Sequence, residues 1–165
     1  MDKGLMLRRP KRTLALGALL IVAALALSFV HPWGDLRAYS SKGAILAGSG
    51  APEEVRALLE KKCGDCHSAN THWPLYARIA PSSWLLEHDV AEGREHMNLS
   101  RWESYGVDGR IDMLARIATQ LRQGKMPLKP YLLMHPEARL SDAERQMIMQ
   151  WTKAERKRLM DSEAK

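Results

Sequence analysis

The stretch Cys63-Gly64-Asp65-Cys66-His67 (CGDCH, residues 63–67) places two thiols three residues apart and a histidine directly after the second one. At the end of a helix, two thiols with this spacing can each add to one of the two vinyl groups on a haem edge, and the adjacent imidazole then faces the iron. The motif therefore predicts one covalently attached haem c, held through Cys63 and Cys66, with His67 as the proximal iron ligand.

Other uses of the two cysteines are alternatives to haem attachment. A thioredoxin-like CxxC motif requires an α/β context, and no segment of the chain alternates polar and apolar residues as a strand does. A zinc site formed by Cys63, Cys66, His67 and His72 would be cramped and would lack a second pair of ligands. A structural disulfide is compatible with an oxidising compartment and stays an alternative. Because the chain has only two cysteines, four-cysteine zinc sites and iron–sulfur clusters are excluded.

The second axial ligand is predicted in the segment Gly124-Lys125-Met126-Pro127. This segment follows a predicted helix end and precedes chain that proline constrains, so it can hold the Met126 thioether against the open face of the iron. A His/Met ligand pair is typical of cytochromes c, and we therefore expect His67 and Met126 to bind the iron. The alternatives are core packing of Met126, an open sixth position, or ligation by another residue, namely Met97, Met134, His72, His88, His96 or His135.

Apolar residues recur at helical spacing through residues 51–165, and prolines and glycines separate the helical segments. Helices are expected from Pro52 to the CGDCH motif, from Ser82 or Ser83 to about Asn98, from about Gly109 to Gln123, and from Ser141 onward. The pattern predicts an all-α fold, with a bundle of about four helices around one haem.

Two of these predicted helices carry further local signals. On the helix that starts at Ser82 or Ser83, Trp84, Leu85 and His88 share one apolar face, which we expect to be buried. On the helix that starts at Ser141, Glu144 follows three residues later and completes a capping box.

The N-terminal third of the sequence predicts export and membrane attachment. Residues 13–30 form an uncharged apolar run of 18 residues, which as a helix would be close to the thickness of the bilayer hydrocarbon. Five cations in residues 1–12 precede the run, so this basic flank should stay in the cytoplasm and residues 51–165 should face the periplasm. We expect a single-pass anchor in the bacterial inner membrane; the alternative is a signal peptide cleaved near Ala24-Leu25-Ala26. Residues 31–50, rich in Gly and Ser from residue 34, are expected to be a linker with little structure of its own.

The overall charge does not indicate a nucleic-acid-binding protein. The chain carries 25 Lys and Arg against 19 Asp and Glu, a net charge of +6. Four of these six net charges lie in residues 1–30, where cations orient a membrane segment, and only +2 remains on the other 135 residues. We therefore expect no nucleic-acid partner.

Two longer stretches resemble a known family. They are CGDCHSANTHWPLYARIAPSSWLLEHDVAEGREHMNLSRW (residues 63–102) and GKMPLKPYLLMHPEARLSDAERQMIMQW (residues 124–151). With their CxxCH, Trp-Pro, Ala-Pro-x-Ser-Trp and Met-Pro motifs, they are similar to the bacterial haem-binding domain family of exported, often membrane-anchored c-type haem proteins. The resemblance covers about residues 52–151. It implies haem held through Cys63, Cys66 and His67, with Met126 at the place of the distal methionine.

Together these features predict a membrane-anchored periplasmic monohaem cytochrome of the c type that carries single electrons to a redox partner protein or respiratory complex. Three alternatives stay open. A haem peroxidase requires an open or labile sixth position at the iron. A gas or redox sensor requires ligand exchange, and an accessory subunit would place its haem in a larger respiratory complex.

Overall fold

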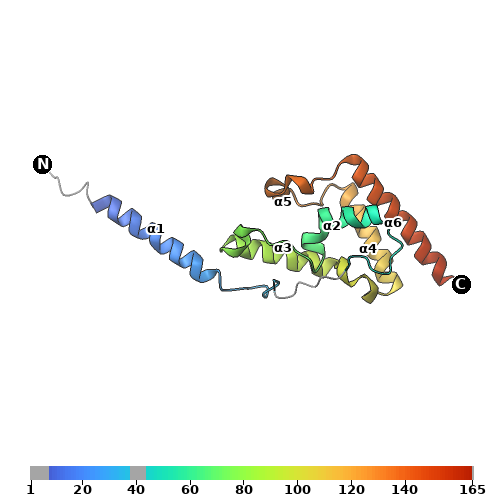
Figure 1. The fold of residues 1–165 in the computed structure, drawn as a ribbon, viewed down its shortest axis with the longest axis horizontal. Helices are drawn as coiled ribbons and strands as arrows, with labels where there is room; N and C mark the ends of the chain where they lie inside the picture. Colours follow the sequence, from blue (N-terminus) through green and yellow to red (C-terminus); the bar gives the residue numbers. More distant parts are fainter. Residues whose placement is uncertain (1–7, 38–43, 165) are drawn as a thin grey trace.

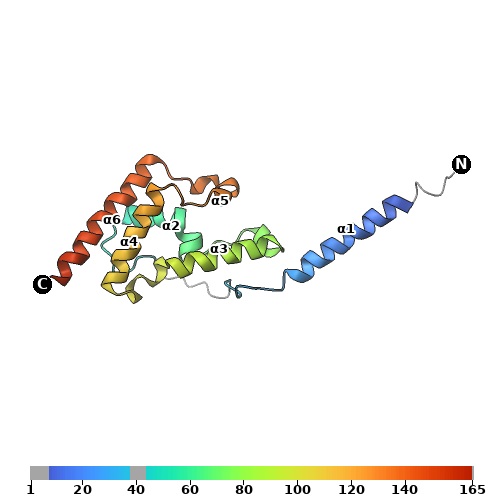
Figure 2. The ribbon, with the colours of Figure 1, turned by 180° about the vertical axis from the view of Figure 1, so that it is seen from behind.

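The computed structural model describes residues 8–37 and 44–164. The described chain is helical and contains no strand, which confirms the predicted all-α class. Helix α1 extends away from a body that the other helices form (Figures 1 and 2). The α-helices are α1 (Arg8–Leu27), α2 (Glu53–His67), α3 (Ser82–His96), α4 (Val107–Arg122), α5 (Lys129–Met134) and α6 (Asp142–Glu163). Three short 3-10 helices span Leu75–Arg78 (η1), Leu99–Ser104 (η2) and Pro136–Ala138 (η3).

The four helices predicted for the body correspond to α2, α3, α4 and α6. The capping box at the start of α6 is present, because the Ser141 hydroxyl accepts from the Glu144 amide and the Glu144 carboxylate accepts from the Ser141 amide. The sequence does not predict α5, because six residues are too few for an apolar period to be seen.

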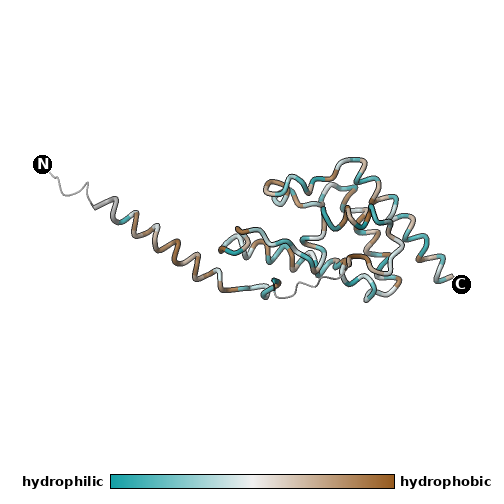
Figure 3. Tube along the Cα trace, in the orientation of Figure 1, coloured by the Kyte–Doolittle hydropathy of each residue, from teal (hydrophilic) through white to brown (hydrophobic). Residues whose placement is uncertain are grey.

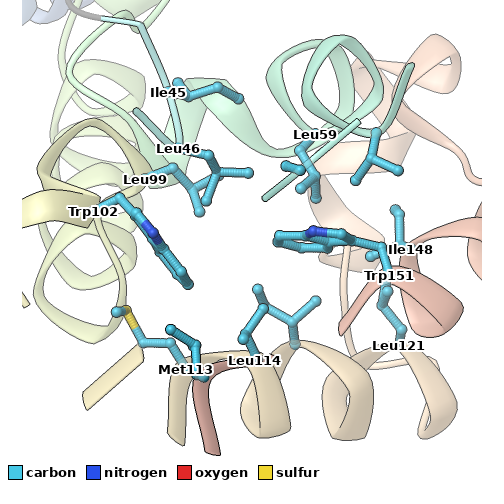
Figure 4. Close-up of a cluster of buried hydrophobic side chains, with 14 of the residues drawn as sticks. Ile45, Leu46, Leu59, Leu99, Trp102, Met113, Leu114, Leu121, Ile148 and Trp151 are labelled. Atoms are coloured by element: carbon cyan, nitrogen blue, oxygen red, sulfur yellow. The ribbon is translucent and has the colours of Figure 1, made fainter. Parts of the chain in front are cut away.

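Helices α4 and α6 pack against each other and together supply nearly half of the residues in the hydrophobic core. Two indole rings, Trp102 from η2 and Trp151 from α6, lie over the α4 side chain Leu114, and all three are buried (Figure 4). Their burial of large apolar surface stabilises the body. Helix α2 packs on α3 and also reaches this core through Val55 and Leu59.

The predicted linker contributes to the core. Ile45 and Leu46 are fully buried, and the Leu46 amide donates to the Leu99 carbonyl oxygen over 2.8 Å. The prediction of little structure is therefore wrong for residues 44–50. The sequence does not reveal that this segment contributes to the core, because Ile45 and Leu46 are only two apolar residues in a stretch rich in glycine and serine.

Residues 28–37, which we call the strap, lie against α3 and η1. The Ala80 amide donates to the Ser28 hydroxyl over 2.9 Å, and the Trp84 indole donates to the Val30 carbonyl oxygen over 2.8 Å. The fully buried Glu87 carboxylate is 2.8 Å from His31 Nδ1 and 3.3 Å from an Arg37 guanidinium nitrogen.

This arrangement corrects the predicted face of α3. Leu85 and His88 are exposed, whereas Ser83, Glu87, Val90 and Gly93 are buried. A carboxylate occupies the buried face because His31 and Arg37 supply its partners from outside the helix, which the periodicity of α3 alone does not reveal.

Helix α1 covers most of the apolar run at residues 13–30, and apolar residues follow one another along it (Figure 3). Among the helices of the described residues, none combines the length and apolar character needed to cross a membrane, so the predicted membrane-spanning helix is not confirmed. Residues 1–7 of the predicted basic flank lie outside the described residues.

Candidate haem site

One cavity of about 390 Å³ lies between α2, α3, α4 and the chain that leads into α5. All four residues predicted to hold the cofactor line this cavity, namely Cys63, Cys66, His67 and Met126. They come from two segments separated by 59 residues, so the fold brings together what the sequence keeps apart.

The two thiols reach the cavity because the CGDCH motif forms the last five residues of α2. Residues three apart lie on the same face of a helix, which places Cys63 and Cys66 side by side along one wall. Neither forms a disulfide. Burial raises the pKa of each thiol to about 12, so both are protonated at neutral pH. Within residues 8–37 and 44–164, no cluster of His, Cys, Asp or Glu could hold a metal ion, which does not favour the zinc alternative.

The imidazole of His67 is held by the end of α3. Its Nδ1 is 2.9 Å from the Gly93 carbonyl oxygen and 3.2 Å from the Met97 carbonyl oxygen, and Nδ1 donates because both partners are acceptors. Burial lowers the pKa of His67, which favours the neutral imidazole. With the proton on Nδ1, the Nε2 lone pair is available to a metal.

A glycine allows α3 to approach the motif closely enough to hold His67. A Cβ atom at Gly93 would lie 2.6 Å from the Cys66 carbonyl oxygen, closer than real Cβ contacts come. This requirement for glycine arises from the crossing of α3 over α2, and no local sequence pattern indicates it.

The structure places only some of the alternative axial ligands at the cavity. Met97 and His96 line the cavity at the end of α3. Three other candidates, His72, His88 and Met134, do not line the cavity. The side chain of His72 is 90% exposed and Met134 is 63% exposed, whereas His88 packs edge-on against Trp33. His135 lies between the Tyr76 hydroxyl and the Glu137 carboxylate, also outside the lining. The lining also includes Met113, a methionine that no sequence pattern indicates as a ligand.

The walls of the cavity suit a flat apolar ring with charged edges. Leu59, Ile117 and Leu121 present apolar side chains, whereas Arg116 and Glu92 are exposed and mark the opening to solvent. The donors on the lining include two free thiols, the His67 imidazole with a free Nε2 and the Met126 thioether, besides His96, Met97 and Met113. The residues present therefore fit a haem, whose macrocycle is apolar and whose propionates prefer polar surroundings.

A hydrogen bond joins the cavity wall that contains Met126 to the CGDCH motif. The Tyr131 hydroxyl at the start of α5 donates to the Asp65 carboxylate over 2.9 Å, and both residues line the cavity. The sequence gives no sign of this contact, because 66 residues separate its two partners.

Comparison with known families agrees with this geometry. The sequence profile described as "Haem-binding domain" matches residues 22–154, most of the chain. The chain belongs to the haem-binding domain family. The predicted family is thus confirmed, and with it a haem cofactor.

The region that matches the family begins earlier in the chain than the predicted haem-binding domain. It begins at residue 22 and includes both the strap and the buried pair Ile45 and Leu46, whereas the predicted domain begins at residue 51. Residues 22–50 are therefore part of the region that matches the family.

The chain is also similar to part of one curated protein. The chain is 27% identical over 122 residues to a protein of Escherichia coli strain K12 named "Cytochrome c peroxidase Ccp". The match covers 70% of this chain and 26% of that protein, so the chain spans about a quarter of its relative. No solved structure gives a significant match.

Proposed function

We propose that this haem-binding domain is a monohaem c-type cytochrome that carries single electrons. Haem would be attached through Cys63 and Cys66, with His67 as the proximal and Met126 as the distal ligand. The observation that carries the proposal is the convergence of these four side chains on one apolar cavity.

When bound, haem supplies a reversible one-electron couple at its iron. The protein's contribution is a rigid, mostly apolar surrounding. The carbonyl oxygens of Gly93 and Met97 fix the plane and tautomer of His67. Leu59, Ile117 and Leu121 limit access of water, so few dipoles need to reorient when the charge changes.

The proposal includes export to the periplasm and attachment to the inner membrane through residues 13–30, where a redox partner protein or respiratory complex would be met. Support comes from the five cations ahead of this run and from its exposed apolar side chains, which include Leu14, Leu19 and Phe29. Covalent attachment also suits an exported protein, because haem lost outside the cytoplasm is not easily replaced.

The ligand assignment is tested by optical and near-infrared spectra of the chain produced with a c-type maturation system. Haem should stay with the chain on a denaturing gel, and the ferric protein should show a thioether-to-iron charge-transfer band that Met126→Ala abolishes. A gel without bound haem would remove the proposal. A band that survives in Met126→Ala would move the distal ligand to another thioether, such as Met97.

The membrane part has its own test. Alkaline carbonate extraction should leave the full chain in the membrane pellet, and N-terminal sequencing should find residue 1 or 2 rather than a residue near Ala26. Release into the supernatant, or a mature N-terminus near Ala26, would overturn the anchor without affecting the haem assignment.

A second candidate function is peroxidase chemistry. The observation that favours it is the relative named cytochrome c peroxidase, which this chain matches over a quarter of that protein's length. A peroxidase needs an open sixth position, so immediate binding of cyanide by the ferric wild-type chain would favour this function over electron transfer.

A further inference from the structure

The segment from Gly124 to His135, which we call the distal flap, buries little of its surface. It contains Met126 and all of α5, and no residue of α5 is buried. Leu133 is 82% exposed. Because local stability follows burial and contact density, the distal flap depends on a few polar contacts for its position.

Two side-chain contacts connect the distal flap to parts of the body that are distant in the sequence. At one, the Tyr131 hydroxyl donates to the Asp65 carboxylate over 2.9 Å, which joins the flap to one of the two residues between the cysteines. At the other, the His135 ring hydrogen-bonds the Tyr76 hydroxyl of η1 and stacks on Tyr131 at 4.3 Å between centroids. Burial and the nearby Asp65 charge raise the pKa of Tyr131, so its hydroxyl stays protonated and remains a donor.

A glycine begins the distal flap, and two prolines lie inside it. Gly124 has a φ of +62°, a left-handed conformation, and an added Cβ atom there would meet no atom within 4 Å. Between this glycine and His135, Pro127 and Pro130 restrict the backbone. The Gly124 amide donates to the Leu121 carbonyl oxygen and the Lys125 amide donates to the Gln120 carbonyl oxygen, so backbone bonds fix the start of the flap. The side-chain contacts of Tyr131 and His135 then position the rest of the segment.

We propose that Tyr131 is a positioning residue for the distal ligand, and that its hydrogen bond to Asp65 latches the distal flap with Met126 against the haem cavity. The Tyr131–Asp65 bond joins the two segments that would supply the axial ligands. Without this bond, Met126 would be held less firmly in the cavity, and the sixth position of a bound iron would become more accessible to a small ligand. The strength of this bond thus sets the balance between a closed electron carrier and an open, ligand-binding form. The inference rests on the proposed ligation by Met126.

The test uses the full-length, haem-loaded ferric chain and imidazole as the external ligand, with binding followed by absorption. Tyr131→Phe removes only the hydroxyl and keeps the ring that stacks on His135. A hydrogen bond to a charged acceptor shifts such an opening equilibrium by on the order of ten- to a hundred-fold. We expect Tyr131→Phe to raise the apparent affinity for imidazole by that factor and to weaken the thioether-to-iron band.

A matched control is Tyr105→Phe. It removes a part-buried tyrosine hydroxyl that accepts from the Asn98 amide over 3.2 Å, and Tyr105 does not line the cavity. This variant should leave imidazole affinity unchanged even if it lowers the thermal midpoint. In a Met126→Ala background no latch is left to open, so adding Tyr131→Phe should change imidazole affinity no further.

The possible outcomes distinguish failure of the proposed latch from failure of the proposed electron-carrier function. If wild type shows the thioether-to-iron band and Tyr131→Phe binds imidazole as wild type does, the latch is wrong and the electron-carrier proposal stands. An equal effect of Tyr131→Phe with and without Met126 also overturns the latch, because the residue then acts by another route. If wild type lacks the band and binds imidazole at once, ligation by Met126 is wrong, and the latch is wrong with it.

Discussion

At the scale of single residues, Gly93 shows most clearly how the absence of a side chain shapes the site. It lies within α3, where glycine is less favourable than alanine by about 0.5–1 kcal/mol. The close contact with the Cys66 carbonyl oxygen explains why a side chain is absent there. The same turn of α3 supplies the carbonyl oxygens that hold His67.

We predict that Gly93→Ala pushes α3 away from α2, lowers stability by about 1–3 kcal/mol through overpacking and reduces the fraction of chain with attached haem. Urea unfolding and the haem-to-protein absorbance ratio measure the two effects. Gly109→Ala in α4 is the matched control, because its Cβ would be 3.8 Å from the nearest atom and the change should be neutral or stabilising. Equal behaviour of the two variants would contradict the packing argument.

At the scale of elements, α6 is held at its start by the Ser141 capping box and at its middle by Glu155. The Glu155 carboxylate accepts from the Gly50 amide over 3.2 Å and from the Arg158 guanidinium over 2.6 and 2.8 Å. The bond from Gly50 joins α6 to the segment that contains the buried residues Ile45 and Leu46.

Ser141→Ala should lower the free energy of unfolding by about 1 kcal/mol, since it leaves the Glu144 amide without its acceptor. Ser162→Ala, at the far end of α6, removes a hydroxyl that only donates to the Leu159 carbonyl oxygen and should have a smaller effect. Chemical denaturation of both variants tests this, and a larger loss from Ser162→Ala would argue against the cap.

Glu155 gives the fold a defined pH dependence. The hydrogen bond from Arg158 lowers the pKa of Glu155 below its usual 4.5 in spite of burial. An acid whose pKa is lower in the folded state stabilises the fold above the unfolded pKa, and this stabilisation is lost as pH falls through the folded pKa. Glu155→Gln should therefore cost about 1–3 kcal/mol at pH 7 and much less near pH 3. Unfolding curves at the two pH values would refute the argument if the difference between wild type and variant were constant.

At the scale of the whole molecule, the strap (residues 28–37) connects α1 to the body. Glu87 is fully buried, and its described partners, His31 and Arg37, both come from the strap. Removing the partners of a buried charge is costly, whereas replacing the whole group by an uncharged one costs less.

The double variant His31→Ala with Arg37→Ala should lower stability by roughly 3 kcal/mol, and adding Glu87→Leu should restore part of the loss. Thermal unfolding and limited proteolysis of the region around residue 37 measure both. Failure of Glu87→Leu to restore stability would show that the strap acts through contacts other than this carboxylate, such as the Trp84 indole on the Val30 carbonyl oxygen.

The sequence by itself determined the all-α class, the helices α2, α3, α4 and α6, and the family, because helical periodicity, the Ser141 cap and the CGDCH motif are local patterns. It also named four of the residues that line the cavity, Cys63, Cys66, His67 and Met126. Only the tertiary structure decided which face of α3 is buried, the core role of Ile45 and Leu46, the strap, and the contact between Tyr131 and Asp65. Each of these depends on partners many residues away: a carboxylate is buried where distant cations meet it, and a glycine is required where two helices cross.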